Sequence, residues 1–167
     1  DKVMTGKSFI APWQGGLGTA LTWKGISLVA QFSWVAGRWV FNNDRYLDEG
    51  NGLFEAYNQS KRLLYDRWKK PGDMTDIPRY GVTPQMDSRF LEDASFIRLK
   101  NLMVSYSFPR TMLKKTNFLT NLRVYAQGQN LLTFTKFSGL DPEGVNNMYQ
   151  AQYPSTRQFT FGLEVSF

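Results

Sequence analysis

The sequence predicts an all-β fold, an antiparallel meander of about five strands with the patterning of a transmembrane β-barrel. Three observations predict it. Several segments alternate between apolar and polar residues, aromatic side chains make up 16% of a chain that is polar on average, and the connections alternate between short and long. Many large rings in a polar chain suit strands that have one apolar and one polar face.

The clearest strand is the last one, predicted at about residues 157–167. Every odd position from Phe159 to Phe167 is apolar, and every even position between them is polar or glycine. Because successive side chains of a strand point to opposite faces, this alternation predicts one continuous apolar face.

The same periodicity predicts four earlier strands, at about residues 16–23, 26–41, 95–108 and 122–135. The first two are separated only by Lys24-Gly25, and a two-residue link with glycine at its second position predicts a tight hairpin turn. In the segment 95–108 the apolar phase changes near Lys100, which predicts a β-bulge there.

The remaining connections are long at residues 42–93, intermediate at 109–121 and long again at 136–156. Tight turns on one side and extended loops on the other are typical of outer-membrane barrels. The longest connection predicts one helix at residues 53–69, because apolar residues recur at helical spacing and Pro71-Gly72 would end it. The favoured role of this basic amphipathic helix is packing against its own loop.

The composition excludes several kinds of chemistry. The chain contains neither cysteine nor histidine, which excludes disulfides, thiolate ligands and nucleophilic sites that need a histidine base. The net charge of +6 comes without a nucleic-acid motif, so neither a nucleic-acid partner nor a cofactor, metal or enzymatic activity is expected. The acidic groups show no metal-ligand spacing and are predicted to be solvated loop charge: Asp48-Glu49, Asp73 with Asp76, Glu92-Asp93 and Asp141-Pro142-Glu143.

Residues 90–102 read Phe-Leu-Glu-Asp-Ala-Ser-Phe-Ile-Arg-Leu-Lys-Asn-Leu, and residues 105–109 read Ser-Tyr-Ser-Phe-Pro. This stretch resembles the late barrel of SusC/RagA-type TonB-linked, or TonB-dependent, outer-membrane transporters. Further matches follow in the same order at residues 122–125, 128–133, 139–143, 153–154 and 157–163, with weaker ones at 23–25, 65–68 and 71–73. Several separated motifs in order make the resemblance specific.

The resemblance implies that residues 1–167 are a C-terminal fragment, the closing part of a barrel of roughly 22 strands. The plug and the remaining barrel would be absent, and the predicted helix would lie in a long extracellular loop. No apolar signal segment follows Asp1-Lys2, which also suggests a removed start or a fragment.

The implied function is TonB-dependent uptake of a nutrient, such as an oligosaccharide or a peptide, across the outer membrane of a Gram-negative bacterium. The implied partners are the rest of the same barrel and its plug, the TonB complex through the missing N-terminus, a SusD-type surface lipoprotein, the glycan or peptide substrate, and outer-membrane lipid.

Three groups of residues are candidates for function. The end of the chain resembles the assembly signal of outer-membrane barrels, carried by Phe159, Phe161, Gly162, Val165 and Phe167. The polar row opposite the apolar one is expected to face the lumen, at Arg123, Tyr125, Gln127, Gln129, Gln158, Thr160 and Glu164. Tyr46, Trp68 and Tyr80 in the long loop are candidates for contact with a partner or a sugar, because flat rings stack on pyranose faces, although loop packing would also explain them.

Three other readings remain open. A soluble β-sandwich binding module would bury the apolar rows against each other. A passive porin would share the strand pattern but would lack energy coupling. A surface-attached hydrolase would need paired carboxylates that act in catalysis.

Overall fold

The computed structural model describes residues 3–51, 53–54, 56–83, 85–114, 118–144 and 146–167. The chain divides into two compact units. We call residues 13–36, 96–135 and 155–167 the sheet unit, and residues 1–12, 37–95 and 136–154 the loop unit.

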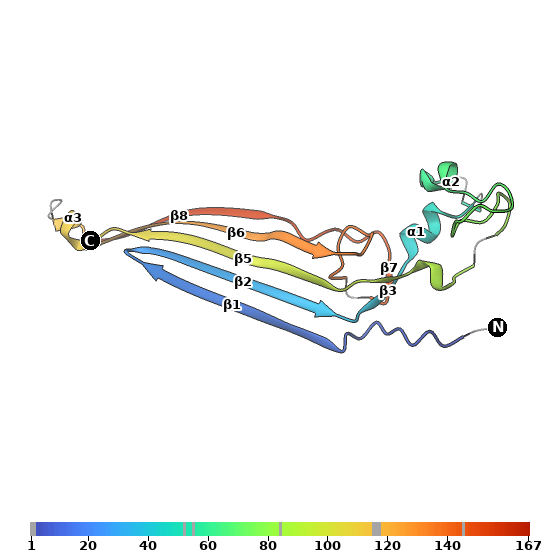
Figure 1. Cartoon of the computed structure of the whole chain (residues 1–167). Coiled ribbons are helices and arrows are strands. Elements are labelled where there is room, and N and C mark those ends of the chain that lie inside the picture. The colour runs from blue at the N-terminus through green and yellow to red at the C-terminus, as the bar shows by residue number, and fades with distance from the viewer. Residues whose placement is uncertain (1–2, 52, 55, 84, 115–117, 145) are drawn as a thin grey trace. The chain divides into compact units, whose positions relative to one another are not determined.

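The sheet unit is a single five-stranded sheet in which neighbouring strands are antiparallel (Figure 1). The observed order confirms the predicted meander. The strands are β1 (Trp13–Trp23), β2 (Ile26–Ala36), β5 (Phe96–Ser107), β6 (Asn121–Thr135) and β8 (Gln158–Ser166). The unit also contains the short helix α3 (Arg110–Leu113), which follows β5.

The turn between β1 and β2 has the conformation that its two residues predict. Lys24 has φ 47° and Gly25 has φ 86°, so both central residues are left-handed, as a type I′ hairpin turn requires. The Ser107 N–H donates to the Gly25 carbonyl at 2.9 Å, and a Cβ on Gly25 would lie 2.7 Å from the Ser107 carbonyl oxygen. The turn therefore needs glycine for its backbone conformation and for its close approach to β5.

The phase change in β5 is a bulge. The register shifts between Leu99 and Asn101, against both β2 and β6, so Lys100 is passed over in both ladders. Leu99 pairs with Phe32 and Leu102 pairs with Ala30, two residues of β2 that lie on the same face. The bulge therefore brings apolar residues of opposite parity onto one face of the sheet.

The loop unit has a small sheet of its own, in the order β4-β3-β7. β3 (Trp39–Asn42) pairs antiparallel with β4 (Leu91–Asp93) and parallel with β7 (Met148–Tyr149). The core of this unit is formed by Val40, Ala94, Phe137 and Tyr149, all at most 6% exposed. Its helices are α1 (Asn43–Asp48), α2 (Arg62–Tyr65) and the 3₁₀ helix η1 (Ser88–Phe90).

Two sequence predictions were wrong in this unit. The strand expected at 26–41 is interrupted, because β2 ends at Ala36 and Gly37 adopts φ 76° before β3 begins in the other sheet. Apolar residues continue to alternate across the break, so periodicity alone could not detect it. The Gly37 N–H instead donates to the Ser95 hydroxyl at 2.9 Å.

The helix expected at 53–69 is also wrong. Among the described residues of that range only α2 is helical. The Ser60 N–H bonds to the Asp48 carbonyl at 2.9 Å, and the Trp68 N–H bonds to the Ile77 carbonyl at 3.0 Å, where a helix would use carbonyls four residues back. Backbone pairing with distant segments therefore replaces most of the helix. The helices of the described chain are all too short or too polar to cross a membrane.

Candidate functional site

The strand register brings the predicted polar row together on one face of the sheet unit. β6 and β8 place Arg123 opposite Glu164 and Gln127 opposite Thr160. The other predicted residues are paired in the same way, with Tyr125 opposite Gly162 and Gln129 opposite Gln158. Because directly opposed residues share a face, the seven side chains form one polar surface across two strands.

This surface continues onto β5 through hydrogen bonds. Arg123 donates to the Ser105 hydroxyl at 3.2 Å and lies 3.5 Å from a carboxylate oxygen of Glu164. Gln127 donates to the Asn101 amide oxygen at 2.7 Å. The polar surface therefore spans three strands. Its side chains include donors and acceptors that can also hydrogen-bond water or a polar solute.

Gly162 lies beneath the ring of Tyr125. A Cβ on Gly162 would be 2.1 Å from Cζ of Tyr125 and 2.4 Å from its hydroxyl oxygen. The missing side chain of the glycine therefore makes the space in which the tyrosine ring lies against the sheet.

The opposite face of the sheet is apolar and uncovered. On β8 the side chains of Phe159, Phe161 and Leu163 are 65–79% exposed, and on β1 Leu17 and Leu21 are exposed to a similar degree. Continuous apolar surface of this kind marks contact with a membrane or a partner. Phe167, which follows β8, stacks on Phe118 with ring centroids 6.2 Å apart.

Tyr46, the first loop candidate, takes part in packing. Its ring meets Phe90 edge-on at 5.3 Å between centroids, and it also contacts Phe54 at 5.7 Å and Phe41 at 6.2 Å. The cluster holds α1 against β3 and η1. A contact role for Tyr46 stays a prediction.

Trp68 and Tyr80 lie apart from Tyr46. Trp68 lines a hollow of about 470 Å³ together with Ile77 and Arg89. Tyr80 is 63% exposed, and the guanidinium of Arg67 lies 5.0 Å from its ring centroid. Trp68 and Tyr80 line two different hollows, and Tyr46 lines neither of them.

One cavity of the loop unit was not expected from the sequence. It has a volume of about 990 Å³ and is open to solvent. One wall comes from α1 and the residues after it, and the other from the segment 138–151. The polar side chains of the first wall are Asn42, Asp44, Arg45, Asp48, Glu49, Tyr57, Asn58, Ser60 and Arg62.

Arg45 and Arg62 connect the acidic side chains of the first wall through ion pairs. Arg45 lies 3.1 Å from Glu49, 2.8 Å from Asp76 and 3.2 Å from Glu92. Arg62 lies 2.6 Å from both Glu49 and Asp76. Burial alone would lower the pKa of Arg45, but the hydrogen bonds and charges of Glu49 and Glu92 outweigh burial and raise it.

The prediction of solvated loop charge was wrong for Glu49, one of the acidic residues of this wall. Its side chain is 3% exposed, and its Oε1 receives both arginines. Asp141, predicted to be solvated as well, is 6% exposed. Asp73 is half-buried at the surface and accepts hydrogen bonds from the backbone N–H groups of Lys69 and Lys70, which lower its pKa.

Asp48 differs from Glu49 because it has no basic partner among the described residues. Loss of surrounding water, then the charges of Asp44 and Glu49, raise the pKa of its carboxyl group. Across the described chain, no group of three or more acidic side chains is arranged to hold a metal ion.

No protein-family model matches the chain. It is similar to TonB-dependent receptor P3 of Formosa agariphila, with 34% identity over 91% of this chain and 16% of that receptor. It is also 35% identical to the TonB-dependent receptor SusC of Bacteroides thetaiotaomicron, over 52% of this chain and 9% of SusC. Among solved structures, the RagAB peptide importer in its open-open state matches with a TM-score of 0.88 and 42% identity, over 96% of this chain and 18% of that one.

The chain belongs to the SusC/RagA type of TonB-dependent receptors. It spans about one sixth of the length of the F. agariphila receptor it matches. The RagAB importer in its closed-closed state matches almost as well as the open-open state, with a TM-score of 0.86. The all-β class and the five-stranded antiparallel sheet are therefore those of a barrel segment of this receptor type.

Sequence reasoning missed the cavity in this receptor segment. One signal was present: Arg45 and Glu49 are four residues apart, the spacing of an ion pair on one helical turn. The other contributors come from residues 62, 76 and 92, whose approach depends on the fold of the loop unit. No spacing in the sequence could have shown that these three residues approach Arg45 and Glu49.

Proposed function

We propose that this segment forms part of the wall and the outside loops of a TonB-dependent receptor in the outer membrane of a Gram-negative bacterium. The intact receptor would import a nutrient such as an oligosaccharide or a peptide. The observation that carries the proposal is a single sheet with one polar and one exposed apolar face, in a chain 42% identical to part of a peptide importer.

The two faces suggest which surface meets lipid and which meets water. The exposed side chains of Phe159, Phe161 and Leu163, with the half-buried Val165 on the same face, would contact lipid, which removes them from water. The hydrogen-bonding row around Arg123 and Gln127 would line the lumen and meet water, plug or solute. Backbone groups at the outer edges of β1 and β8 would pair with strands of the remaining barrel.

The proposed partners follow from the family. A SusD-type lipoprotein would cover the outside loops, and the TonB complex would supply energy through the plug. The segment 159–167 would act as the assembly signal of the barrel. The exposure of Phe159, Phe161 and Phe167 supports this role, since an accessory protein can reach these side chains before the barrel closes.

Uptake by cells carrying the full-length gene tests this proposal. Deleting the gene should abolish growth on the imported oligosaccharide or peptide, and deleting tonB should do the same. Continued uptake without TonB would instead support a passive porin. Loss of growth with normal surface levels of the receptor after Phe167 is deleted would contradict the assembly role.

The alternative of a soluble β-sandwich has less support. A sandwich needs a second sheet against the apolar face, yet side chains such as Phe161, at 79% exposure, are uncovered. A hydrolase also has less support, because the relatives are named as receptors and importers.

A further inference from the structure

We propose that the cavity of the loop unit binds a protonated amine of the imported solute. The inference rests on the proposed uptake function, because it assigns to this cavity the recognition of one group on the cargo. The amine could belong to the N-terminus or a lysine of a peptide, or to an amino sugar.

The first argument is the balance of charge around the cavity. Its walls carry the carboxylates of Asp44, Asp48 and Glu49 and the guanidinium groups of Arg45 and Arg62. Asp76 also pairs with both arginines, and Glu92 pairs with Arg45, although neither acid lines the cavity. With Arg89, whose guanidinium donates to the Asp76 carbonyl at 2.8 Å, five carboxylates stand against three guanidinium groups. The region is therefore negative, although the chain as a whole carries a net charge of +6.

The second argument is a buried acceptor without a partner. Oε1 of Glu49 receives Arg45 and Arg62, whereas Oε2 is buried and accepts no hydrogen bond from the described residues. A buried charged oxygen that lacks a donor is costly. Glu49 lines the cavity, and a donor that reaches Oε2 from there would satisfy this oxygen.

The third argument is the character of the other side chains. Asp48 is exposed and has no basic partner in the part of the chain that the structure describes, so its carboxylate can pair with a cation. The ring of Tyr57 is 62% exposed on the same wall, and aromatic faces attract ammonium groups. Asn58 and Ser60 add neutral hydrogen-bonding groups. Carboxylates beside a ring suit an organic ammonium better than a bare metal ion, which needs several oxygen ligands at once.

Binding to the purified full-length receptor tests the inference. The probes are triglycine and N-acetyl-triglycine, and chitotriose with free amines and its N-acetylated counterpart. We expect a probe with a free amine to bind about tenfold more tightly than its acetylated form, with the difference shrinking as salt rises. The pair that shows the difference identifies a peptide or an amino sugar as the source. Equal binding of the free and acetylated forms in both pairs would overturn the inference.

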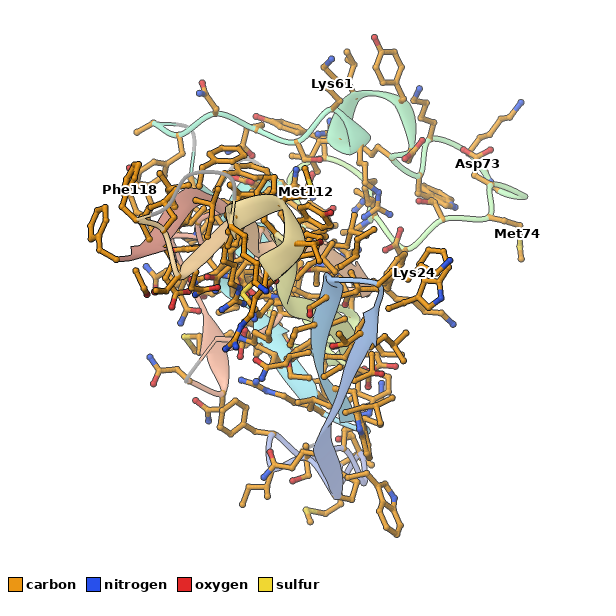
Figure 2. All side chains as sticks on the ribbon, turned by 90° about the vertical axis from the view of Figure 1, so that its left-hand side faces the viewer. Lys24, Lys61, Asp73, Met74, Met112 and Phe118 are labelled. Atoms are coloured by element: carbon orange, nitrogen blue, oxygen red, sulfur yellow. The ribbon has the colours of Figure 1, made fainter. Side chains whose placement is uncertain are left out.

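The variant Asp48→Asn removes one charge at nearly constant volume and should abolish most of this preference. The matched control is Asp73→Asn, a charge in the same loop that lies beside exposed Met74 (Figure 2) and does not line the cavity. Its amide oxygen can still cap the turn. Equal losses in both variants would show that general loop charge, and not the cavity, attracts the amine. Asp44→Asn provides a second test if Asp48→Asn reduces surface levels.

The pH dependence of this preference gives a second test, because it would not change if Asp48 had only a structural role. A bound cation favours the Asp48 carboxylate, so the preference should be lost as pH falls through the raised pKa of Asp48. The charged groups that act on Asp48 are the carboxylates of Asp44 and Glu49. Asp48→Asn should flatten this profile. If the Asp48→Asn receptor still imports an acetylated probe, transport itself is intact. Failure of the amine site can then be distinguished from failure of the uptake proposal.

Discussion

The sheet unit and the loop unit are stabilised in opposite ways. The sheet unit is held by long antiparallel ladders of backbone hydrogen bonds, and many of its large apolar side chains face outward. The loop unit has short strands and buries a few apolar residues beside a network of arginines and carboxylates. The difference shows that the apolar face of the sheet suits a non-aqueous environment. The loop unit depends instead on packing and ion pairs between its side chains.

The largest expected effect tests the network of the loop unit. Replacing Glu49 with leucine removes the buried carboxylate that accepts from both Arg45 and Arg62, so we expect the loop unit to lose about 3–5 kcal/mol. Hydrogen exchange in the full-length receptor should speed up in residues 43–51 and 62–66. If β5 and β6 lost protection to the same degree, the two units would not be stabilised independently.

The next effect tests the outward face of the sheet unit. Val165→Arg should destabilise the barrel by about 2–4 kcal/mol if the residue lies near the membrane midplane, because a charge would enter lipid. Ser166→Arg, on the opposite face, serves as the matched control and should be milder. Reversible unfolding of the receptor in lipid bilayers measures both, and equal losses would contradict the assignment of the faces.

A smaller effect tests the packing of the polar face. Gly162→Ala should cost about 1–3 kcal/mol, since its Cβ would overlap the ring of Tyr125 and force the ring to move. In a Tyr125→Ala background the same change should cost almost nothing. Thermal unfolding of the four receptors closes this double-mutant cycle, and additive losses would rule out the contact as the cause.

The smallest effect concerns acid stability of the loop unit. Burial alone would raise the pKa of Asp76, but the charges of Arg62 and Arg45 lower it overall. Its contribution is therefore present above the unfolded pKa of about 4 and is lost as pH falls below it. Asp76 is 43% exposed, so we expect at most about 1 kcal/mol. Limited proteolysis of the loops against pH should show a smaller acid effect in Asp76→Asn than in the native receptor, whereas Asp66→Asn should change it little.

The strands of the sheet unit could be predicted because their signal is local. A strand reveals its two faces at every second residue, and the turn at Lys24-Gly25 and the bulge at Lys100 are each marked by a few adjacent residues. The polar row was predicted in the same way, and the observed register shows that its members share a face. Its position in the lumen and the assembly role of residues 159–167 remain predictions.

The loop unit resisted prediction because distant segments determine its local structure. Apolar spacing at 53–69 favoured one helix, but hydrogen bonds from Ser60 to Asp48 and from Trp68 to Ile77 determine where the chain turns. Glu49 resembled solvated charge until two arginines and a fold around them buried it.

The sequence by itself determined the all-β class, the order of strands, the alternation of faces and the resemblance to SusC/RagA-type receptors, because each follows from adjacent residues or from ordered motifs. Only the tertiary structure decided that β2 ends at Ala36, that Tyr125 lies over Gly162 and that Glu49 is buried in the wall of a cavity. These features depend on contacts between residues far apart in the chain, and such contacts produce no periodic pattern in the sequence.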